Sequence, residues 1–192
     1  MNQRFLILTA LFASISFAPG CAPVIVAGGA TAAVAGGDRR TQGSFVDDGS
    51  IEIKARRALN DEPDFGDDVH INITSMNGIV LLTGETTTAD TRDRATALIR
   101  EIPGIRRIVS EIRVAEPRAF MYTSNDSWIT GKVKAKLIGT EGLPSRQIKV
   151  VTENSVVYLM GLVTQKEGEI AAETARTIGG ITRVVKLFEY LD

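Results

Sequence analysis

Few residues in this 192-residue sequence could carry out catalysis or hold a metal ion. It has one cysteine, Cys21, and one histidine, His70, so carboxylates would have to supply most ligands of a zinc site. His70 alternates with Val69 and Ile71, as a polar residue on a strand surface does. No nucleophile-elbow motif and no glycine-rich phosphate loop is found. We therefore predict a non-enzyme with no catalytic residue, no metal site and no cofactor.

A cluster of acidic residues is the other candidate for ion binding. A calcium loop has acids at regular alternate positions and a closing glutamate, and the cluster lacks both features. We interpret it as a solvated acidic loop, made of Asp61, Glu62, Asp64, Asp67 and Asp68.

The charge is distributed unevenly along the chain. The formal net charge is −1, which gives no sign of a nucleic-acid partner. Residues 47–114 carry a net charge of −4, whereas residues 115–192 carry +1. The acidic residues are therefore concentrated in the middle third, and the C-terminal third is mildly basic.

The first residues are typical of a secretory signal. A short basic start precedes the apolar run Phe5–Phe17, which is too short to span a bilayer. The run leads into Ala18-Pro19-Gly20-Cys21, which resembles the lipobox of bacterial lipoproteins, although Ala18 stands where leucine is usual. We predict a lipoprotein signal peptide over 1–20 and lipidation at Cys21. A plain signal peptide cleaved near Gly20 is the alternative.

The next segment, residues 21–45, is rich in alanine, glycine and valine and shows no polar/apolar period. Its glycines disfavour a helix, so we expect a lipidated flexible tether. Several acyl chains give a stable membrane anchor. Residue 22 is alanine and not aspartate, which by resemblance to enterobacterial sorting rules implies the outer membrane. The expected location is lipid-anchored at the outer membrane, facing the periplasm.

The remainder of the chain is a duplication with a spacing of about 77 residues. Three blocks match in the same order with slips of only one or two residues, and such repeats indicate the architecture. Residues 48–59 match 126–137, residues 77–84 match 154–161, and residues 103–109 match 179–185. The predicted modules are 46–115 and 116–192.

Each copy is expected to form helix, strand, strand, helix and strand. In the first copy Asp48 is expected to cap a helix to Leu59, and Asn77-Gly78 is a strong hairpin signal. Gly84 is expected to close the returning strand, and Thr88 or Asp90 to cap the second helix. In the second copy we expect helices over 126–138 and 165–178 and strands over 147–152, 155–160 and 182–190. The predicted fold class is α+β, with two tandem αββαβ modules, each a three-stranded mixed sheet with two helices on one face.

This pattern resembles the BON domain, a module of bacterial periplasmic and outer-membrane proteins. The resemblance is carried by the hairpin glycines Gly84 and Gly161, the alanine-containing second helix, and the steps Gly104–Val109 and Gly180–Val185. It implies a non-catalytic outer-membrane lipoprotein that binds anionic phospholipids, such as phosphatidylglycerol and cardiolipin, chiefly through the second module. It also implies a role in outer-membrane integrity.

The helix expected over 126–138 carries the candidate binding residues. At 100° per residue, Trp128 lies about 140° around the helix from the centre of the core stripe of Ile129, Val133 and Leu137. An indole prefers the membrane interface, and lysines are attracted to anionic lipid. The first copy has serine in place of the tryptophan. The predicted phospholipid-binding residues are Trp128, Gly131, Lys132, Lys134, Ala135 and Lys136.

Two alternatives remain open. The ring of Trp128 could pack against a loop or the sister module, with the lysines forming only a solvated face. Equally, the protein could be a scaffolding lipoprotein that docks on envelope assembly machinery or on peptidoglycan-associated partners, with Trp128 as a protein hot spot.

Overall fold

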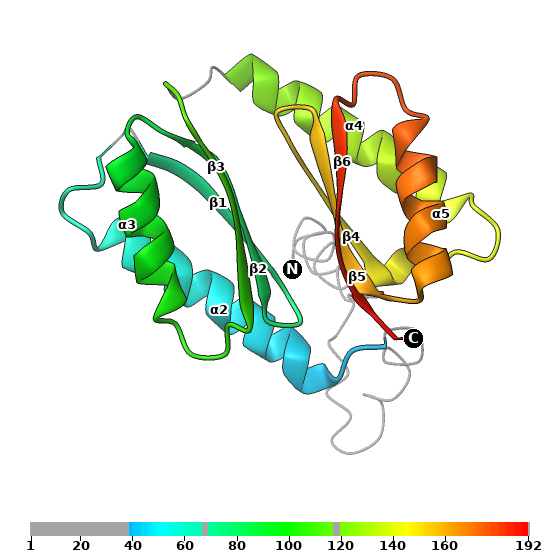
Figure 1. Ribbon diagram of the computed structural model, residues 1–192, viewed down its shortest axis with the longest axis horizontal. Helices are drawn as coiled ribbons and strands as arrows, with labels where there is room; N and C mark the ends of the chain where they lie inside the picture. The colour runs from blue at the N-terminus through cyan, green and yellow to red at the C-terminus, as the bar shows by residue number, and fades with distance from the viewer. Residues whose placement is uncertain (1–38, 67–68, 117–119, 192) are drawn as a thin grey trace, which may run out of the picture. The chain divides into compact units, whose positions relative to one another are not determined.

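Two copies of an αββαβ unit form the folded part of the chain (Figure 1). The computed structural model describes residues 39–66, 69–116 and 120–191. The first copy comprises α2 (Gln42–Asn60), β1 (Val69–Met76), β2 (Ile79–Thr86), α3 (Ala89–Arg100) and β3 (Arg107–Val114). The second comprises α4 (Phe120–Ile138), the 3₁₀ turn η2 (Ser145–Gln147), β4 (Ile148–Glu153), β5 (Val156–Val163), α5 (Gln165–Arg176) and β6 (Arg183–Tyr190).

Each copy has a three-stranded mixed sheet. The order is β1-β2-β3 in the first sheet and β4-β5-β6 in the second. The first pair of each sheet is antiparallel and the second pair is parallel, so the central strand has a partner of each kind. Both helices of a copy contribute to one core on one face of its sheet (Figure 1). The predicted α+β class and module architecture are confirmed.

The predicted hairpin turn between β1 and β2 is confirmed by its backbone. Asn77 and Gly78 both have positive φ, at 52° and 73°. Two-residue hairpins of this type require positive φ at both positions, which asparagine and glycine tolerate best. Asn154 and Ser155 occupy the same conformation in the second copy, with φ of 56° and 59°.

The first helix of each copy begins earlier than predicted. α2 starts at Gln42, because Thr41 accepts a hydrogen bond from the backbone of Ser44 and serves as the N-cap. The last four residues of the predicted tether are therefore helical, and its residues 21–38 lie outside the described part. In the second copy α4 starts at Phe120 and not at Asp126.

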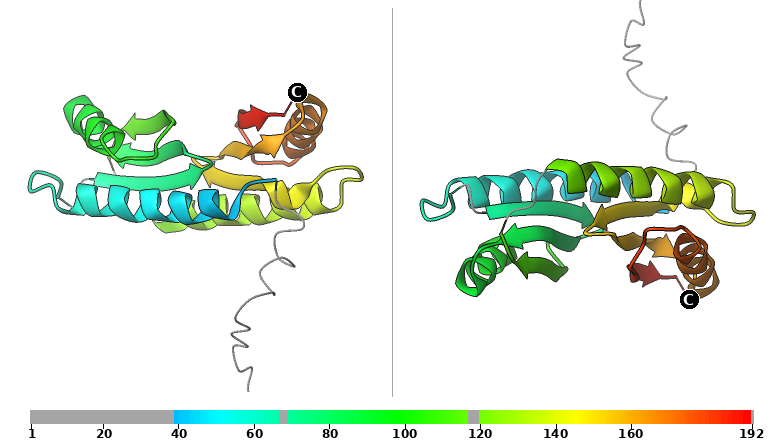
Figure 2. Two further views of the ribbon diagram at one scale, coloured as in Figure 1. Left: turned by 90° about the horizontal axis from the view of Figure 1, so that it is seen from below. Right: turned by 90° about the horizontal axis from the view of Figure 1, so that it is seen from above.

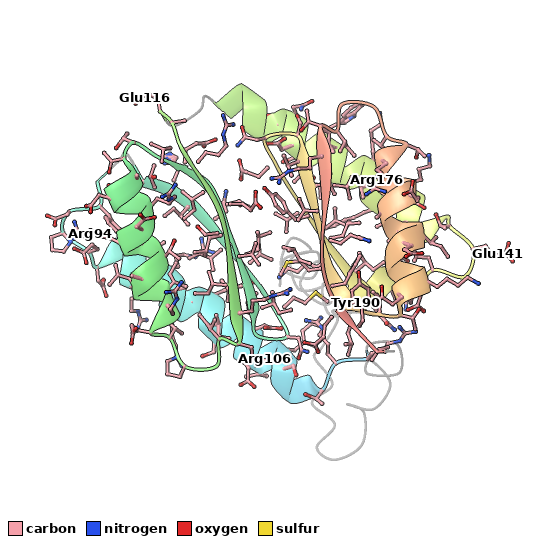
Figure 3. The ribbon with its side chains drawn as sticks, in the orientation of Figure 1. Arg94, Arg106, Glu116, Glu141, Arg176 and Tyr190 are labelled. Carbon is pink, nitrogen blue, oxygen red and sulfur yellow. The ribbon has the colours of Figure 1, made fainter. Side chains whose placement is uncertain are left out.

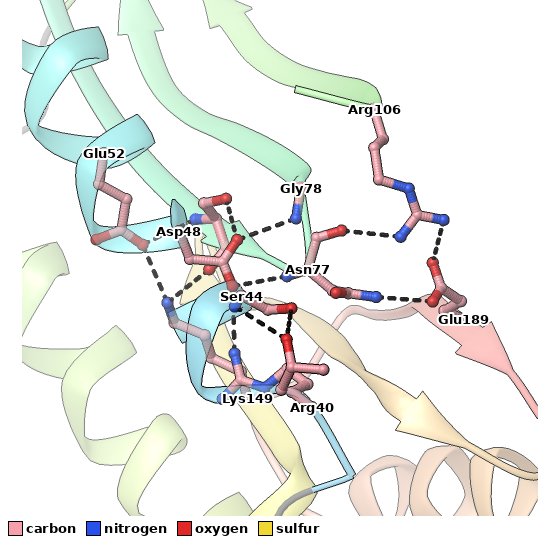
Figure 4. A network of polar contacts seen from close by, with 11 residues as sticks. Arg40, Ser44, Asp48, Glu52, Asn77, Gly78, Arg106, Lys149 and Glu189 are labelled. Carbon is pink, nitrogen blue, oxygen red and sulfur yellow. Dashed lines mark hydrogen bonds and ion pairs between the residues drawn. The ribbon is translucent and has the colours of Figure 1, made fainter. Parts of the chain in front are cut away.

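The prediction that Asp48 caps a helix is wrong, because this carboxylate lies inside α2 and caps the hairpin turn instead (Figure 4). It accepts hydrogen bonds from the backbone N–H groups of Asn77 and Gly78 at 2.7 and 3.0 Å and from Ser75 Oγ at 2.7 Å. Asp126 does the same in α4, accepting from the N–H groups at 154 and 155 at 2.9 Å each. Each aspartate therefore joins a helix to the hairpin beneath it.

The prediction that Gly84 closes a strand is also wrong. β2 continues to Thr86, and Gly84 lies within it opposite Ile71 with φ of 116°. A Cβ atom at this position would lie 1.9 Å from the carbonyl oxygen of His70. Glycine is therefore required by the close approach of β1 and by a backbone conformation that L-residues disfavour.

The central strands are buried on both faces. In β2, Val80 and Leu82 contact the helices, whereas Ile79 and Leu81 point the other way. This second face packs against the corresponding face of β5 and its neighbours, and side chains fill the space between the sheets (Figure 3). All of the described residues belong to one compact unit. The cluster between the sheets contains Met76, Ile79, Leu81, Tyr158, Met160 and Leu187.

Polar contacts surround this apolar cluster. Arg183 donates to Glu111 at 2.5 Å, and the hydroxyl of Tyr158 donates to the same carboxylate at 3.2 Å. Arg106 of the first module forms an ion pair with Glu189 of the second at 2.7 Å. Burial, followed by the nearby Glu111 charge, raises the pKa of Tyr158 to about 12.

The segment before α2 also contacts the second module. Arg39 donates two hydrogen bonds to Glu167 at 2.6 and 2.8 Å, a bidentate arrangement. Glu167 in turn completes a capping box with Thr164 at the start of α5. The Arg39 hydrogen bonds are the main cause that lowers the pKa of Glu167 to about 2.

Candidate functional site

Trp128 lies on the outer side of α4. Its side chain is 57% exposed, whereas Ile129, Val133 and Leu137 on the opposite side are almost completely buried. Those three residues follow one another at four-residue spacing and hold the helix on its sheet, so they set the direction in which the indole points. The ring is packed neither in the core nor between the two sheets.

The ring of Trp128 has a lysine ammonium directly over it. Lys132 Nζ lies 3.6 Å from the ring centroid, which is a close cation–π contact. Lys132 is four residues further along the helix, so it lies one turn away on the same side. The helix therefore presents an indole and a positive charge as one unit.

The small residues predicted beside this pair leave its surroundings open. Gly131 is exposed, and a Cβ atom built there would meet nothing within 4 Å. Ala135 is exposed as well. Within the described chain no other helix or strand lies on the outer side of α4 (right-hand view of Figure 2). Among the described residues, no helix or strand therefore stands between the ring of Trp128 and a broad approaching surface.

The two remaining predicted lysines lie apart from this pair. Lys136 donates to Thr177 Oγ1 at 2.5 Å and so reaches towards the end of α5. Lys134 is exposed on the other edge of the helix, where it lines a groove with Ile138 and Arg146. Two further residues of this groove were not predicted from the sequence. Ile138 is 72% exposed, and Arg146 follows α4 by several residues and adjoins it only in the fold.

The corresponding helix of the first module has a different surface. Ser50 stands where Trp128 stands in the second copy, and it is half-buried. Glu52 accepts a hydrogen bond from the backbone of Ser75 and forms an ion pair with Lys149 at 3.1 Å. An aromatic ring under a cation is present, but it is Phe45 under Arg40 near the start of α2.

The rejected ion-binding candidates have structural partners or are exposed. His70 is exposed on β1, and Glu62 and Asp64 both pair with Arg94. Asp67 and Asp68 lie outside the described residues, as does Cys21, whose lipidation stays a prediction. Over residues 39–66, 69–116 and 120–191, no group of three or more potential metal ligands is found. No helix in the same ranges combines the length and apolar character that a membrane span needs.

The order of elements and the mixed sheets define a protein built from two modules of one small α+β type. The BON domain family matches residues 47–116 and 125–192, so the chain belongs to the BON-domain family.

Its relatives include Outer membrane lipoprotein DolP of Haemophilus influenzae, with 36% identity over 185 residues and 96% of each chain covered. The 21 kDa hemolysin of Actinobacillus pleuropneumoniae is 33% identical over 155 residues, which cover 81% of this chain and 80% of that one. Osmotically-inducible protein Y of Escherichia coli is 26% identical over 145 residues, covering 74% and 72%. The resemblance predicted from the sequence is confirmed, and the chain is a dual BON-domain lipoprotein of the DolP type.

Proposed function

We propose that this protein is a non-catalytic, lipid-anchored protein of the outer membrane that binds anionic phospholipid through α4 and supports outer-membrane integrity. The observation that carries the proposal is the exposed ring of Trp128 with Lys132 Nζ 3.6 Å from its centroid. The relative DolP is by name an outer membrane lipoprotein, which supports the location. Acylation at Cys21 would hold the periplasm-facing modules close to a leaflet.

Two small energetic contributions act together in the proposed binding. Complete burial of a large apolar side chain contributes about 1.5–3 kcal/mol, so covering the exposed part of Trp128 contributes about 1–2 kcal/mol. Each lysine close to an anionic surface adds about 1 kcal/mol. The proposed contact surface is Trp128, Gly131, Lys132, Lys134, Ala135 and Lys136. It binds phosphatidylglycerol and cardiolipin better than neutral lipid, because only the anionic headgroups attract the lysines.

The test uses the whole chain in a non-acylated Cys21→Ser form. Trp128 is the only tryptophan, so its fluorescence reports this helix alone. Phosphatidylglycerol vesicles are expected to shift the emission to the blue at low salt and less at high salt. Trp128→Ala is expected to weaken binding, measured by co-sedimentation, by about 5- to 30-fold.

Phe45→Ala is the matched control, because Phe45 is 52% exposed and also lies against a cation, but on α2. It is expected to leave vesicle binding unchanged. Equal binding by the wild-type chain and the Trp128→Ala variant would refute the proposal. A photo-crosslinker at position 128 that yields one stoichiometric protein adduct in the envelope, and no lipid adduct, would favour the scaffolding alternative.

A further inference from the structure

A groove runs beside the proposed contact surface, between α4 and the start of β4. Its volume is about 200 Å³. The floor is apolar, since Leu137 and Ile148 are buried core residues. Ile138 stands at the edge and is 72% exposed. The lining residues are Lys134, Leu137, Ile138, Ser145, Arg146 and Ile148.

Two cations line this groove. Lys134 comes from α4 and Arg146 from the turn η2, so the fold brings together charges from two separate elements. In the described residues neither side chain forms an ion pair or a hydrogen bond. Glu141 belongs to the loop after α4 and lies at the outer tip of that loop (Figure 3). The groove therefore combines an apolar floor with two positive charges available to an anion.

The first module provides an internal comparison. A groove of about 530 Å³ lies at the equivalent place, between α2 and β1. It has one cation, Arg56, where the second module has Lys134, and Asn60 where the second module has Ile138. The loop beside it is acidic, and its Glu62 and Asp64 pair with Arg94. Among the described lining residues, the first groove thus lacks the second cation and the exposed isoleucine that line the α4–β4 groove.

We propose that the α4–β4 groove binds the headgroup phosphate of one anionic phospholipid through Lys134 and Arg146. Part of an acyl chain then lies over Ile138 and the apolar floor. This inference rests on the function proposed above and adds a lipid site to it. Lys134 lies six residues after Trp128, roughly 9 Å along the helix. The indole and the groove can therefore contact the same leaflet on two edges of α4.

The test compares two double variants of the Cys21→Ser chain that lose the same charge. Lys134→Gln with Arg146→Gln removes both groove cations. Arg56→Gln with Lys166→Gln removes two exposed cations elsewhere. The groove variant is expected to bind phosphatidylglycerol vesicles about 25-fold more weakly, from about five-fold per cation. The control variant is expected to change binding less than about two-fold, and thermal unfolding verifies that both variants fold.

A second measurement locates the lipid and identifies its source. Methyl NMR signals of Ile138 and Ile148 are followed while short-chain phosphatidylglycerol, glycerophosphate or inorganic phosphate is added. We expect saturable shifts with the lipid that are lost in the groove variant, and none with the two soluble phosphates at equal concentration. Equal shifts with inorganic phosphate would make this a free-phosphate site and overturn the lipid assignment.

The outcomes separate this inference from the function on which it rests. If Trp128→Ala weakens vesicle binding and the groove variant does not differ from its charge-matched control, the groove site is wrong and Lys134 is not part of the contact surface, but the proposed binding through Trp128 and Lys132 stands. If the wild-type chain does not bind anionic vesicles at all, both are wrong.

Discussion

The aspartates that join each first helix to its hairpin are expected to be among the most sensitive positions of the fold. Asp48 is 5% exposed, and its carboxylate accepts hydrogen bonds from two backbone N–H groups of the turn and from Ser75. Hydrogen bonds to a charged group contribute about 1.5–3 kcal/mol, and a buried donor left without a partner is costly. We therefore expect Asp48→Ala to lower the free energy of unfolding by about 3–5 kcal/mol.

Two related substitutions, Asp48→Asn and Asp126→Ala, test the same hydrogen bonds. Asp48→Asn keeps one acceptor oxygen, so it is expected to cost about half as much as alanine. Asp126→Ala removes the two bonds to the second hairpin and is expected to cost about 2–4 kcal/mol. Asp47→Ala is the matched control, because Asp47 is the exposed neighbour of Asp48 on the same helix. Its effect is expected to stay within about 0.5 kcal/mol.

Urea unfolding is the assay, followed by far-ultraviolet circular dichroism for the whole chain and by Trp128 fluorescence for the second module. If Asp48→Ala shifts the unfolding midpoint no more than Asp47→Ala does, Asp48 does not stabilise the turn. If Asp48→Asn is as destabilising as Asp48→Ala, the acceptor oxygens are not what stabilises the turn.

Three further results are expected. Gly84→Ala should destabilise the fold by more than about 3 kcal/mol, because its Cβ would lie 1.9 Å from a carbonyl oxygen. Gly131→Ala, on an open helix surface, should stabilise the fold by up to about 1 kcal/mol. Thermal unfolding should therefore show changes of opposite sign for the two variants. Arg39→Ala should cost about 1 kcal/mol at neutral pH, and the gap to wild type should close as pH falls from about 4.5 towards 2. In that window the unfolded chain protonates Glu167, whereas the folded protein keeps it ionised until its lowered pKa of about 2. A gap that stays constant in unfolding curves at pH 7 and pH 2.5 would contradict this expectation. Tyr158, with its pKa raised to about 12, should ionise above the ordinary range of a tyrosine in a spectroscopic titration, and its contribution to stability should be lost as pH rises from about 10 through 12.

Much of the fold could be predicted from local patterns. The repeat identified the two modules, and the Asn77-Gly78 turn has the positive φ angles expected of it. The exposure of Trp128 followed from the four-residue spacing of the core residues, because that spacing determines which side of α4 faces water. These features depend on neighbours in sequence or on one helix turn.

The features that could not be predicted depend on residues far apart in the chain. Asp48 was interpreted as a helix cap because aspartate favours that position, but its partners are in a hairpin about 30 residues away. The start of α2 was missed since Gly43 and Gly49 weaken the helix pattern locally. Arg146 reaches the α4 groove only through the path of the loop before it, which no local pattern reveals.

The packing of the two sheets against each other has a consequence for how the protein should be dissected genetically. Each module covers the apolar face of the other module's sheet that no helix packs against, and Leu81 and Met160 there are both completely buried. A fragment with one module would expose that apolar face to water and would tend to aggregate. Deleting a whole module therefore tests solubility as much as activity, and point substitutions on the outer helix surfaces are the cleaner means of assigning roles to each half.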